Sequence, residues 1–370
     1  MNTLTIRDAV PEDLNALVAL EKRCFDLDRL SRRSFQHLLT HGHAFILVAE
    51  DGDRAMLGNA VVLLHRSTPL ARLYSIAVAP EARGHRVGSS LLEAAEGKAL
   101  ELGSSFMRLE VRPDAPAPYN LYRSHGYREL GIYEEYYEDG AHAIRMEKAL
   151  AGGANFPGSK TPYYAQTLPF TCGPAALIMA MRTQDPDYIA DRRDEIDIWR
   201  ESTTIYMTAG HGGCSADGLA LAADARGFGA EILINTTGDD VFTSSVRNEE
   251  KKEVVRLVQQ DFRRRVEEAG IPVRTGTAQS ADLRSALAEG KSPMVLISHY
   301  RLTLERAPHW VIVTAVDDRF IYIHDPEPDP PENRFETDCM NLPLAHSEFD
   351  RMTSYGKDRL SAAVFIRRKN

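Results

Sequence analysis

The first 150 residues alternate between short apolar runs and segments with a helical period. Leu14, Leu17, Val18 and Leu20 fall on one face of a helix, and a longer helix is predicted over 87–102. Apolar runs predict strands at 4–7, 43–50, 56–65, 71–79, 106–112, 129–138 and 143–147, with a short helix ending near 124. This order predicts an α/β domain built on a mixed sheet.

Residues 151–160, AGGANFPGSK, show neither the helical period nor the strand pattern of the preceding segments. They contain three glycines and one proline and have no apolar repeat, which is typical of an interdomain linker. A chain of 370 residues also exceeds the size at which one hydrophobic core usually stops growing. We therefore predict two domains, 1–150 and 161–370, joined by this linker.

The second half opens with an extended segment, 161–170. Helical patterns follow at 173–181, 217–226 and 248–269, and strand patterns come later, at 294–298, 310–317 and 320–324. Helices first and sheet last is an α+β order.

Composition limits the possible partners. The net charge of -9 disfavours a broad nucleic-acid-binding face and favours basic peptides, and no apolar run is long enough to span a membrane. The first residues lack a signal or transit pattern, so we expect a soluble, cytoplasmic protein. The four cysteines show no C-x-x-C spacing, which argues against a zinc ribbon and against a disulfide framework and predicts reduced thiols. We expect no metal site. The oligomeric state stays open.

The segment 75–92 combines a strand, a turn with two glycines and the start of a helix. Backbone N–H groups at a helix N-terminus attract an anion, and Gly84 and Gly88 would let a pyrophosphate approach closely. Such a turn also occurs as a simple connection between elements. The surrounding sequence therefore decides whether it is interpreted as an anion-binding site.

That context resembles the acyl-CoA-binding motif of the GNAT acetyltransferases, R/Q-x-x-G-x-G/A, present here as Arg83-Gly-His-Arg-Val-Gly88. Arg86 stands where glycine is commonest. Downstream, Leu109-Glu-Val-Arg112, Leu121-Tyr122 and Gly126-Tyr127 extend the resemblance over nearly all of 1–150. It implies acetyl-CoA as co-substrate, held by Ile76, Ala77, Val78, Arg83, Gly84, His85, Arg86, Val87, Gly88 and Ser89.

Members with this layout include enzymes that acetylate protein N-termini, such as the ribosomal-protein alanine acetyltransferases. The resemblance implies Glu110 as general base, directly or through water, and Tyr122 as the acid that protonates the departing thiolate. The alternatives are a solvated strand-end carboxylate and a packing aromatic ring. Ala115 replaces an asparagine that often precedes the short helix in the family. The resemblance therefore does not imply which acetyl acceptor this chain uses.

The second half carries a different set of reactive side chains. Cys172 opens an apolar helix, where the helix N-terminus favours a thiolate and should lower the thiol pKa. Gln166 lies six positions earlier and could donate to an oxyanion. His309 begins one apolar strand and Asp325 follows the next, so adjacent strands could present them together.

This set resembles the papain-like cysteine peptidases, in particular the bacteriocin-exporter peptidase domains that cut after a double glycine. The resemblance implies Cys172 as nucleophile, His309 as general base and acid, Asp325 as orienter of the imidazole and Gln166 as oxyanion donor. The alternative is an inactive domain that binds peptides, with a buried cysteine and a core histidine.

Other residues are weaker candidates. His211 could be a second base but fits a polar turn better, Trp310 fits a hydrophobic wall beside the imidazole, and Cys214 and Cys339 fit ordinary thiols. Leu150-Ala-Gly-Gly153 superficially matches a double-glycine cleavage site in the linker.

The leading hypothesis is a bifunctional enzyme: an acetyl-CoA-dependent N-acetyltransferase of a peptide or protein amine, coupled to a thiol peptidase. One alternative keeps the acetyltransferase and makes the C-terminal domain a non-catalytic peptide-binding module. Another is acetylation of a small-molecule amine.

Overall fold

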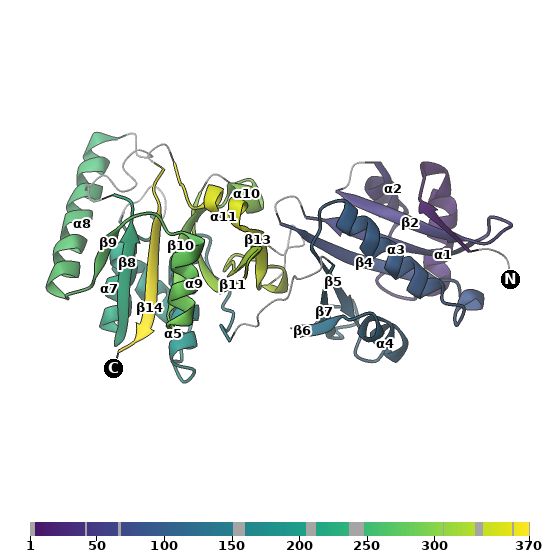
Figure 1. The fold of residues 1–370 in the computed structure, drawn as a ribbon, viewed down its shortest axis with the longest axis horizontal. Helices are drawn as coiled ribbons and strands as arrows, with labels where there is room; N and C mark the ends of the chain where they lie inside the picture. The colour runs from purple at the N-terminus through teal and green to yellow at the C-terminus, as the bar shows by residue number, and fades with distance from the viewer. Residues whose placement is uncertain are drawn as a thin grey trace. The chain divides into compact units, whose positions relative to one another are not determined.

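The structure is a computed structural model that describes residues 4–40, 43–65, 68–150, 160–204, 212–236, 248–305, 307–329, 336–356 and 359–369. The chain divides into two compact units, Met1–Asn155 and Phe156–Asn370 (Figure 1). Each unit has its own seven-stranded sheet and its own helices. The two units are therefore two domains, and each is described by itself.

The N-terminal sheet has the strand order β1-β2-β3-β4-β5-β7-β6. Only β4 and β5 run parallel, and the other neighbours are antiparallel, so the mixed sheet predicted from the sequence is confirmed. The strands are β1 (Thr5–Asp8), β2 (Ala44–Glu50), β3 (Met56–Leu64), β4 (Leu70–Val78), β5 (Phe106–Val111), β6 (Arg128–Tyr133) and β7 (Ala143–Ala149).

The helices of this domain are α1 (Leu14–Cys24), α2 (Arg32–Thr40), α3 (Val87–Glu101) and α4 (Pro116–Ser124), with short turns η1 (Pro11–Asp13) and η2 (Pro80–Ala82). In α3, Leu91, Leu92, Ala95 and Ala99 form a fully buried face at helical spacing. The sequence reading had no α2, which is short and places only Phe35 in the core.

One predicted strand of this domain is too long. The strand expected over 129–138 ends at Tyr133 as β6, and a turn follows. In that turn Tyr136 packs against both Tyr133 and Tyr137.

The parallel strands β4 and β5 separate along their length. Their register pairs Leu70 with Phe106 and ends at Leu73 with Leu109, although β4 continues to Val78. The last part of β4 is therefore paired only with β3. The unpaired edge of β4 lies directly before the loop that leads into α3.

The C-terminal sheet has the order β13-β12-β11-β10-β14-β8-β9 and is antiparallel except between β8 and β9. Its strands are β8 (Phe228–Ile234), β9 (Val273–Thr275), β10 (Ser292–Ser298), β11 (Pro308–Val316), β12 (Phe320–His324), β13 (Leu342–Ala345) and β14 (Ala362–Arg368). Its helices are α5 (Cys172–Gln184), α6 (Arg192–Ser202), α7 (Ala216–Ala225), α8 (Glu249–Glu268), α9 (Ser280–Ala288), α10 (Tyr300–Thr303) and α11 (His346–Met352), with the turn η5 (Glu336–Asp338).

Helix α5 lies at the centre of this domain. Every residue from Gly173 to Met181 is buried, and the helix packs against β10, β11 and β14. The expected order of helices first and sheet last is only partly right, because β8 enters the sheet before α8 begins. Short segments that are buried almost throughout, such as β8 with Glu231 as its one charged residue, lack the alternation that would separate them from a buried helix.

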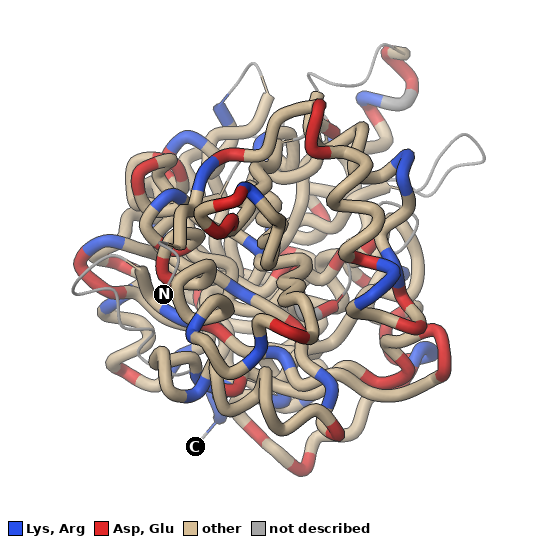
Figure 2. The backbone as a smooth tube through the Cα atoms, turned by 90° about the vertical axis from the view of Figure 1, so that its right-hand side faces the viewer, with Lys and Arg blue, Asp and Glu red and all other residues tan. Residues whose placement is uncertain are grey.

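Among the described residues, no helix is both long enough and apolar enough to cross a membrane. Basic and acidic residues are interspersed along the described backbone in Figure 2. The net charge of -9 is therefore spread over the chain and not confined to one segment.

A single glycine fixes how α7 packs on α6. A Cβ atom built on Gly218 would lie 2.6 Å from the carbonyl oxygen of Ser202 and 2.7 Å from its Cα. We predict that Gly218→Ala lowers the free energy of unfolding by about 1–3 kcal/mol, because neither backbone can move freely. Gly97→Ala in α3 is the control: its Cβ would meet nothing within 4 Å, and alanine should stabilise that helix by up to about 1 kcal/mol. Urea unfolding of both variants measures the difference, and equal stabilities would contradict the prediction.

Candidate active sites

The candidate acetyl-CoA loop lies where β4 separates from β5. Ile76, Ala77 and Val78 form the end of β4, and Arg83 to Arg86 are exposed between η2 and α3. No side chain caps the first amides of α3, which begins at Val87. The end of β4, the exposed loop and the uncapped N-terminus of α3 therefore follow one another directly. Such an arrangement suits an extended pyrophosphate ligand.

Arg86 adopts the backbone conformation that explains the usual glycine at its position. Its φ is 63°, in the left-handed region, and it is the residue directly before α3. Gly84, two residues earlier, has φ of 81°. An arginine can take this conformation at a cost of roughly 1–2 kcal/mol, so the departure from the motif leaves the turn geometry intact.

Glu110 is not a solvated carboxylate. Its side chain is 4% exposed and lies between two guanidinium groups, with Arg72 Nε 2.9 Å from Oε2 and Arg145 Nε 3.3 Å from Oε1. Arg145 lies directly opposite Glu110 in the pairing of β5 with β7. Arg72 also donates to the hydroxyl of Tyr136 at 2.9 Å. Any proton that Glu110 accepts would weaken both ion pairs.

Tyr122 lies on α4 and is 5% exposed. Burial raises the pKa of its hydroxyl well above the usual value, and the negative charge of Glu110 raises it further. The hydroxyl is therefore protonated at neutral pH, as a general acid must be. Because the charge of Glu110 acts on Tyr122, the two predicted residues lie in one region of the domain.

In the C-terminal domain, Cys172 is the first residue of α5 and is half-buried. Desolvation of the thiol raises its pKa to about 12, the backbone N–H groups of Trp310 and Gly173 act in the opposite direction, and the charges of Glu327 and Asp325 raise it again. The expectation that the helix N-terminus lowers this pKa is therefore wrong for the free protein, because burial outweighs the amide donors.

His309 and Asp325 form the contact that the sequence predicted. His309 Nε2 lies 2.7 Å from Asp325 Oδ1, and both side chains are buried. The pairing of β11 with β12 brings the start of one strand next to the end of the other. The backbone amide next to His309, that of Trp310, faces the Cys172 thiol, so the three residues belong to one site.

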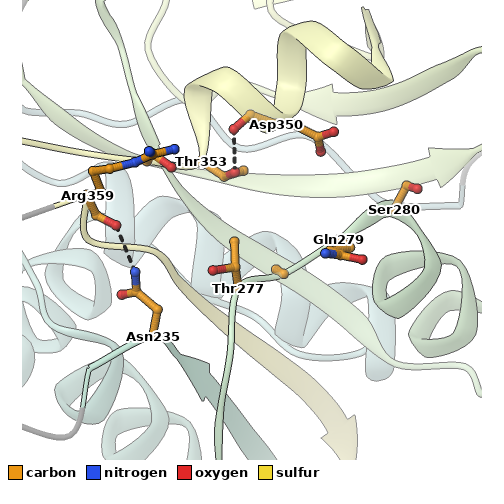
Figure 3. Close-up of a pocket in the computed structure, with 9 residues that line it drawn as sticks. Asn235, Thr277, Gln279, Ser280, Asp350, Thr353 and Arg359 are labelled. Carbon is orange, nitrogen blue, oxygen red and sulfur yellow. Dashed lines mark hydrogen bonds between the residues drawn. The ribbon is translucent and has the colours of Figure 1, made fainter.

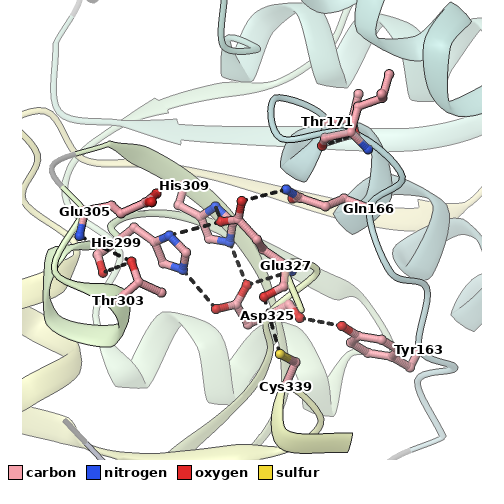
Figure 4. A network of polar contacts seen from close by, with 11 residues as sticks. Tyr163, Gln166, Thr171, His299, Thr303, Glu305, His309, Asp325, Glu327 and Cys339 are labelled. Carbon is pink, nitrogen blue, oxygen red and sulfur yellow. Dashed lines mark hydrogen bonds and ion pairs between the residues drawn. The ribbon is translucent and has the colours of Figure 1, made fainter. Parts of the chain in front are cut away.

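A second histidine, His299, completes this cluster (Figure 4). Its ring stacks on His309 with a centroid separation of 3.8 Å and an angle of 8°, and its Nε2 lies 3.1 Å from Asp325 Oδ2. Sequence analysis missed it. Its position directly after the strand predicted at 294–298 could have identified it. Ile297 of that strand pairs with His309, and this register brings the two histidines side by side.

Glu327 connects the histidines to Gln166. Gln166 Nε2 donates to Glu327 Oε1 at 3.0 Å, and Glu327 Oε2 lies 3.2 Å from His299 Nδ1 and 3.8 Å from His309 Nδ1. The amide predicted to bind an oxyanion is thus engaged by a carboxylate. Two hydrogen bonds hold the extended segment that contains Gln166. The Tyr163 hydroxyl donates to the Asp325 carbonyl, and the Gln166 N–H donates to the Pro326 carbonyl.

The remaining candidates contact the edge of this cluster or lie outside the described residues. Cys214 is buried, and its carbonyl accepts from the Trp310 indole at 3.0 Å. Cys339 is buried with its thiol 3.5 Å from the Glu327 carbonyl. His211 and the Ala151–Gly153 part of the linker are not among the described residues.

A pocket of about 570 Å³ lies elsewhere in the C-terminal domain (Figure 3). Its lining is polar and includes Asn235, Thr277, Asp350 and Arg359, with Asn235 donating to the Arg359 carbonyl at 2.8 Å. None of the predicted catalytic residues lines it.

The two domains, an α/β domain on a mixed sheet and a second domain with its own sheet and helices, were compared with known families. Residues 14–127 match the acetyltransferase (GNAT) family, whose co-substrate is acetyl-CoA. Residues 161–367, more than half of the chain, match the Peptidase_C39 like family. The chain belongs to the Peptidase_C39 like family and carries a GNAT acetyltransferase domain before it.

Individual relatives cover parts of the chain. An uncharacterised protein of Mycobacterium leprae is 30% identical over 39% of this chain, and the match spans 40% of that protein. A Bacillus subtilis protein, provisionally named a [ribosomal protein bS18]-alanine N-acetyltransferase, is 27% identical over 36% of this chain and 87% of its own length. The solved ribosomal-protein-S18-alanine N-acetyltransferase of Escherichia coli is 26% identical, with 42% of this chain and 100% of that one covered and a TM-score of 0.37.

The ion pairs of Glu110 lead to a stability prediction. Glu110→Ala leaves Arg72 and Arg145 without their buried anion, so the free energy of unfolding should fall by about 3–5 kcal/mol. Glu81→Ala is the control, because its pair with Arg23 is exposed and its loss should change little. Chemical denaturation compares the two, and a Glu110 variant as stable as the control would show that the pairs do not hold the sheet together.

The charge of Glu327 leads to a prediction for Cys172. Because this charge raises the thiol pKa, Glu327→Gln should lower it and shift alkylation by iodoacetamide to lower pH. At a fixed pH near 8, labelling of Cys172 should be roughly threefold to tenfold faster, as expected for a shift of half a unit to one unit. Peptide mapping by mass spectrometry assigns the label. Glu348→Gln, on α11, should label at the wild-type rate, and equal rates in both variants would count against the effect of Glu327.

Proposed function

We propose that the protein is a bifunctional enzyme that transfers acetyl groups from acetyl-CoA to the amine of a peptide or protein and cleaves peptides with Cys172. The observation that carries the second activity is the buried His309–Asp325 pair at 2.7 Å beside the Cys172 thiol. We place it in the cytoplasm, where the four free cysteines would stay reduced.

In the acetyltransferase domain, the amides at the start of α3 would bind the pyrophosphate of acetyl-CoA. Tyr122 would protonate the departing thiolate, which its raised pKa supports. Glu110 would draw a proton from the acceptor ammonium through water and not by direct contact, since its oxygens are held by Arg72 and Arg145. The Bacillus subtilis relative favours an N-terminal amine of a protein as acceptor over a small-molecule amine.

In the peptidase domain, the Cys172 sulfur would attack the scissile carbonyl as its proton passes to His309 Nδ1. The departing amine then takes this proton, and water hydrolyses the thioester. Because burial raises the thiol pKa, His309 would have to act as a general base that takes the proton during the attack. Gln166 joins the oxyanion site only when the substrate displaces Glu327 from its amide.

The two activities fit one substrate. Peptide cleavage creates a new α-amine, which is the acceptor that an N-terminal acetyltransferase needs, and joining both domains in one chain raises the effective concentration. The second candidate is a non-catalytic peptide-binding domain. It is favoured by the raised pKa of Cys172 and by the bond that Glu327 makes to Gln166.

A peptide library with free N-termini tests both activities in the full chain. Wild-type protein with acetyl-CoA should produce cleaved peptides whose new N-termini are acetylated, as read by mass spectrometry. Cys172→Ala should abolish cleavage and leave acetylation of the uncut peptides unchanged, and Cys214→Ala should retain both. Acetylation without any Cys172-dependent cleavage would favour the binding module, and acetylation of small amines alone would favour the small-molecule enzyme.

A further inference from the structure

The polar pocket of the C-terminal domain is formed by segments that are distant in the sequence. Asn235 directly follows β8, residues 277–280 lead into α9, Asp350 lies near the end of α11, and Arg359 belongs to the turn before β14 (Figure 3). Its volume of about 570 Å³ lies within the roughly 300–1,000 Å³ that is usual for a small-ligand site. Apart from Ala278, every residue that lines it is polar or charged, so the pocket suits a hydrophilic ligand.

Arg359 supplies a positive charge to this pocket. Its main-chain carbonyl accepts from Asn235 Nδ2 at 2.8 Å, and Asn235 Oδ1 accepts the N–H of Ser361 at 2.9 Å. The φ of Arg359 is 51°, a left-handed conformation that costs an arginine about 1–2 kcal/mol and persists because these bonds hold the backbone. Its guanidinium makes no hydrogen bond or ion pair with another described residue. It is therefore available to a carboxylate, which it can bind with two parallel hydrogen bonds.

Asp350 supplies the opposite charge. Its main-chain carbonyl accepts from the Thr353 hydroxyl at 3.1 Å, whereas its carboxylate has no hydrogen-bond or ion-pair partner among the described residues. Asp350 and Arg359 therefore line one pocket without pairing with each other. A ligand that bridges them needs a positive group for Asp350 and a negative group for Arg359.

The balance of charge selects among hydrophilic ligands. A phosphate monoester carries a charge of about -1.5 to -2 and would leave excess negative charge beside Asp350. A neutral sugar would leave both charged side chains without a counter-charge. A molecule with one carboxylate and one ammonium group matches both side chains and leaves no net charge. The side chains of Thr277, Gln279 and Ser280 make no hydrogen bonds with other described residues, so they can bind its remaining polar groups.

We propose that this pocket binds a small zwitterion, a free amino acid or a short peptide with free termini. Arg359 binds the carboxylate of the ligand and Asp350 binds its ammonium group. None of the predicted catalytic residues lines the pocket, so the ligand does not contact Cys172 there. A peptidase in the same domain would release ligands of this class. That connection rests on the proposed function, whereas the binding itself does not.

Binding is tested by calorimetry on full-length Cys172→Ala protein without acetyl-CoA, so that a peptide is neither cleaved nor acetylated. Alanine and trialanine are the probes, and we expect one ligand per chain. Adding Arg359→Gln or Asp350→Asn should weaken binding about tenfold or more, because each removes a hydrogen bond between charged groups. Arg351→Gln is the matched control. Arg351 lies on α11 next to Asp350, is 64% exposed and does not line the pocket, so this variant should bind as its parent does.

Blocked peptides assign each end of the ligand. N-acetyl-trialanine has no ammonium group and trialanine amide has no carboxylate, so each should bind about tenfold more weakly than trialanine. Asp350→Asn should not weaken binding of the acetylated peptide further, and Arg359→Gln should not weaken binding of the amide further. In each case the partner of the substituted side chain is already missing.

The outcomes separate the two sources of the ligand and decide the proposal. Tighter binding of alanine would support an amino acid site, and tighter binding of trialanine would support a peptide site. No binding of either probe at millimolar concentration, or tighter binding of inorganic phosphate, would overturn the proposal. Binding that survives both pocket variants would place the probe elsewhere and would also overturn it. Asp350 and Arg359 are exposed, and if either variant fails to fold, the blocked peptides still test the charge pairing on the parent protein. No outcome depends on peptide cleavage, so failure of the proposed peptidase is distinguishable.

Discussion

The buried carboxylate of Asp325 is the constraint on which the C-terminal site depends. It has no solvent contact, and its charge is satisfied by His299, His309 and the backbone N–H of Glu327. An unpaired carboxylate at this depth would be strongly unfavourable. The need to satisfy it orders two strand ends and the loop that follows β12, and so places every other group of the site.

The loop that carries this carboxylate also links distant parts of the chain. The main-chain carbonyl of Asp325 accepts from Tyr163, and that of Pro326 from the Gln166 N–H, so the segment before α5 is fixed against the loop after β12. Cys172 begins α5 directly beyond this segment and lies beside the Trp310 amide. Nucleophile, base and amide donor thus meet through hydrogen bonds to one loop.

The N-terminal site depends on a different constraint, the end of pairing between β4 and β5. The pairing of these strands ends at Leu73 and Leu109, and no side chain caps the start of α3, so the proposed acetyl-CoA site lies at the end of β4. Glu110 lies on β5 directly after Leu109, and its carboxylate forms ion pairs with Arg72 and Arg145. A sheet that opens at this point needs such ion pairs to keep β4, β5 and β7 together below it.

The sequence by itself determined the two-domain organisation, the strand, turn and helix within residues 75–92, and the meeting of His309 with Asp325. These follow from local patterns: strand and helix periods, glycines at a turn, and polar residues at the ends of neighbouring strands. Tertiary structure alone decided the pKa of Cys172, the ion pairs of Glu110 and the places of His299 and Glu327. Burial and cross-strand register set these features, and neither can be read from spacing along the chain, since both depend on which distant segments pack together.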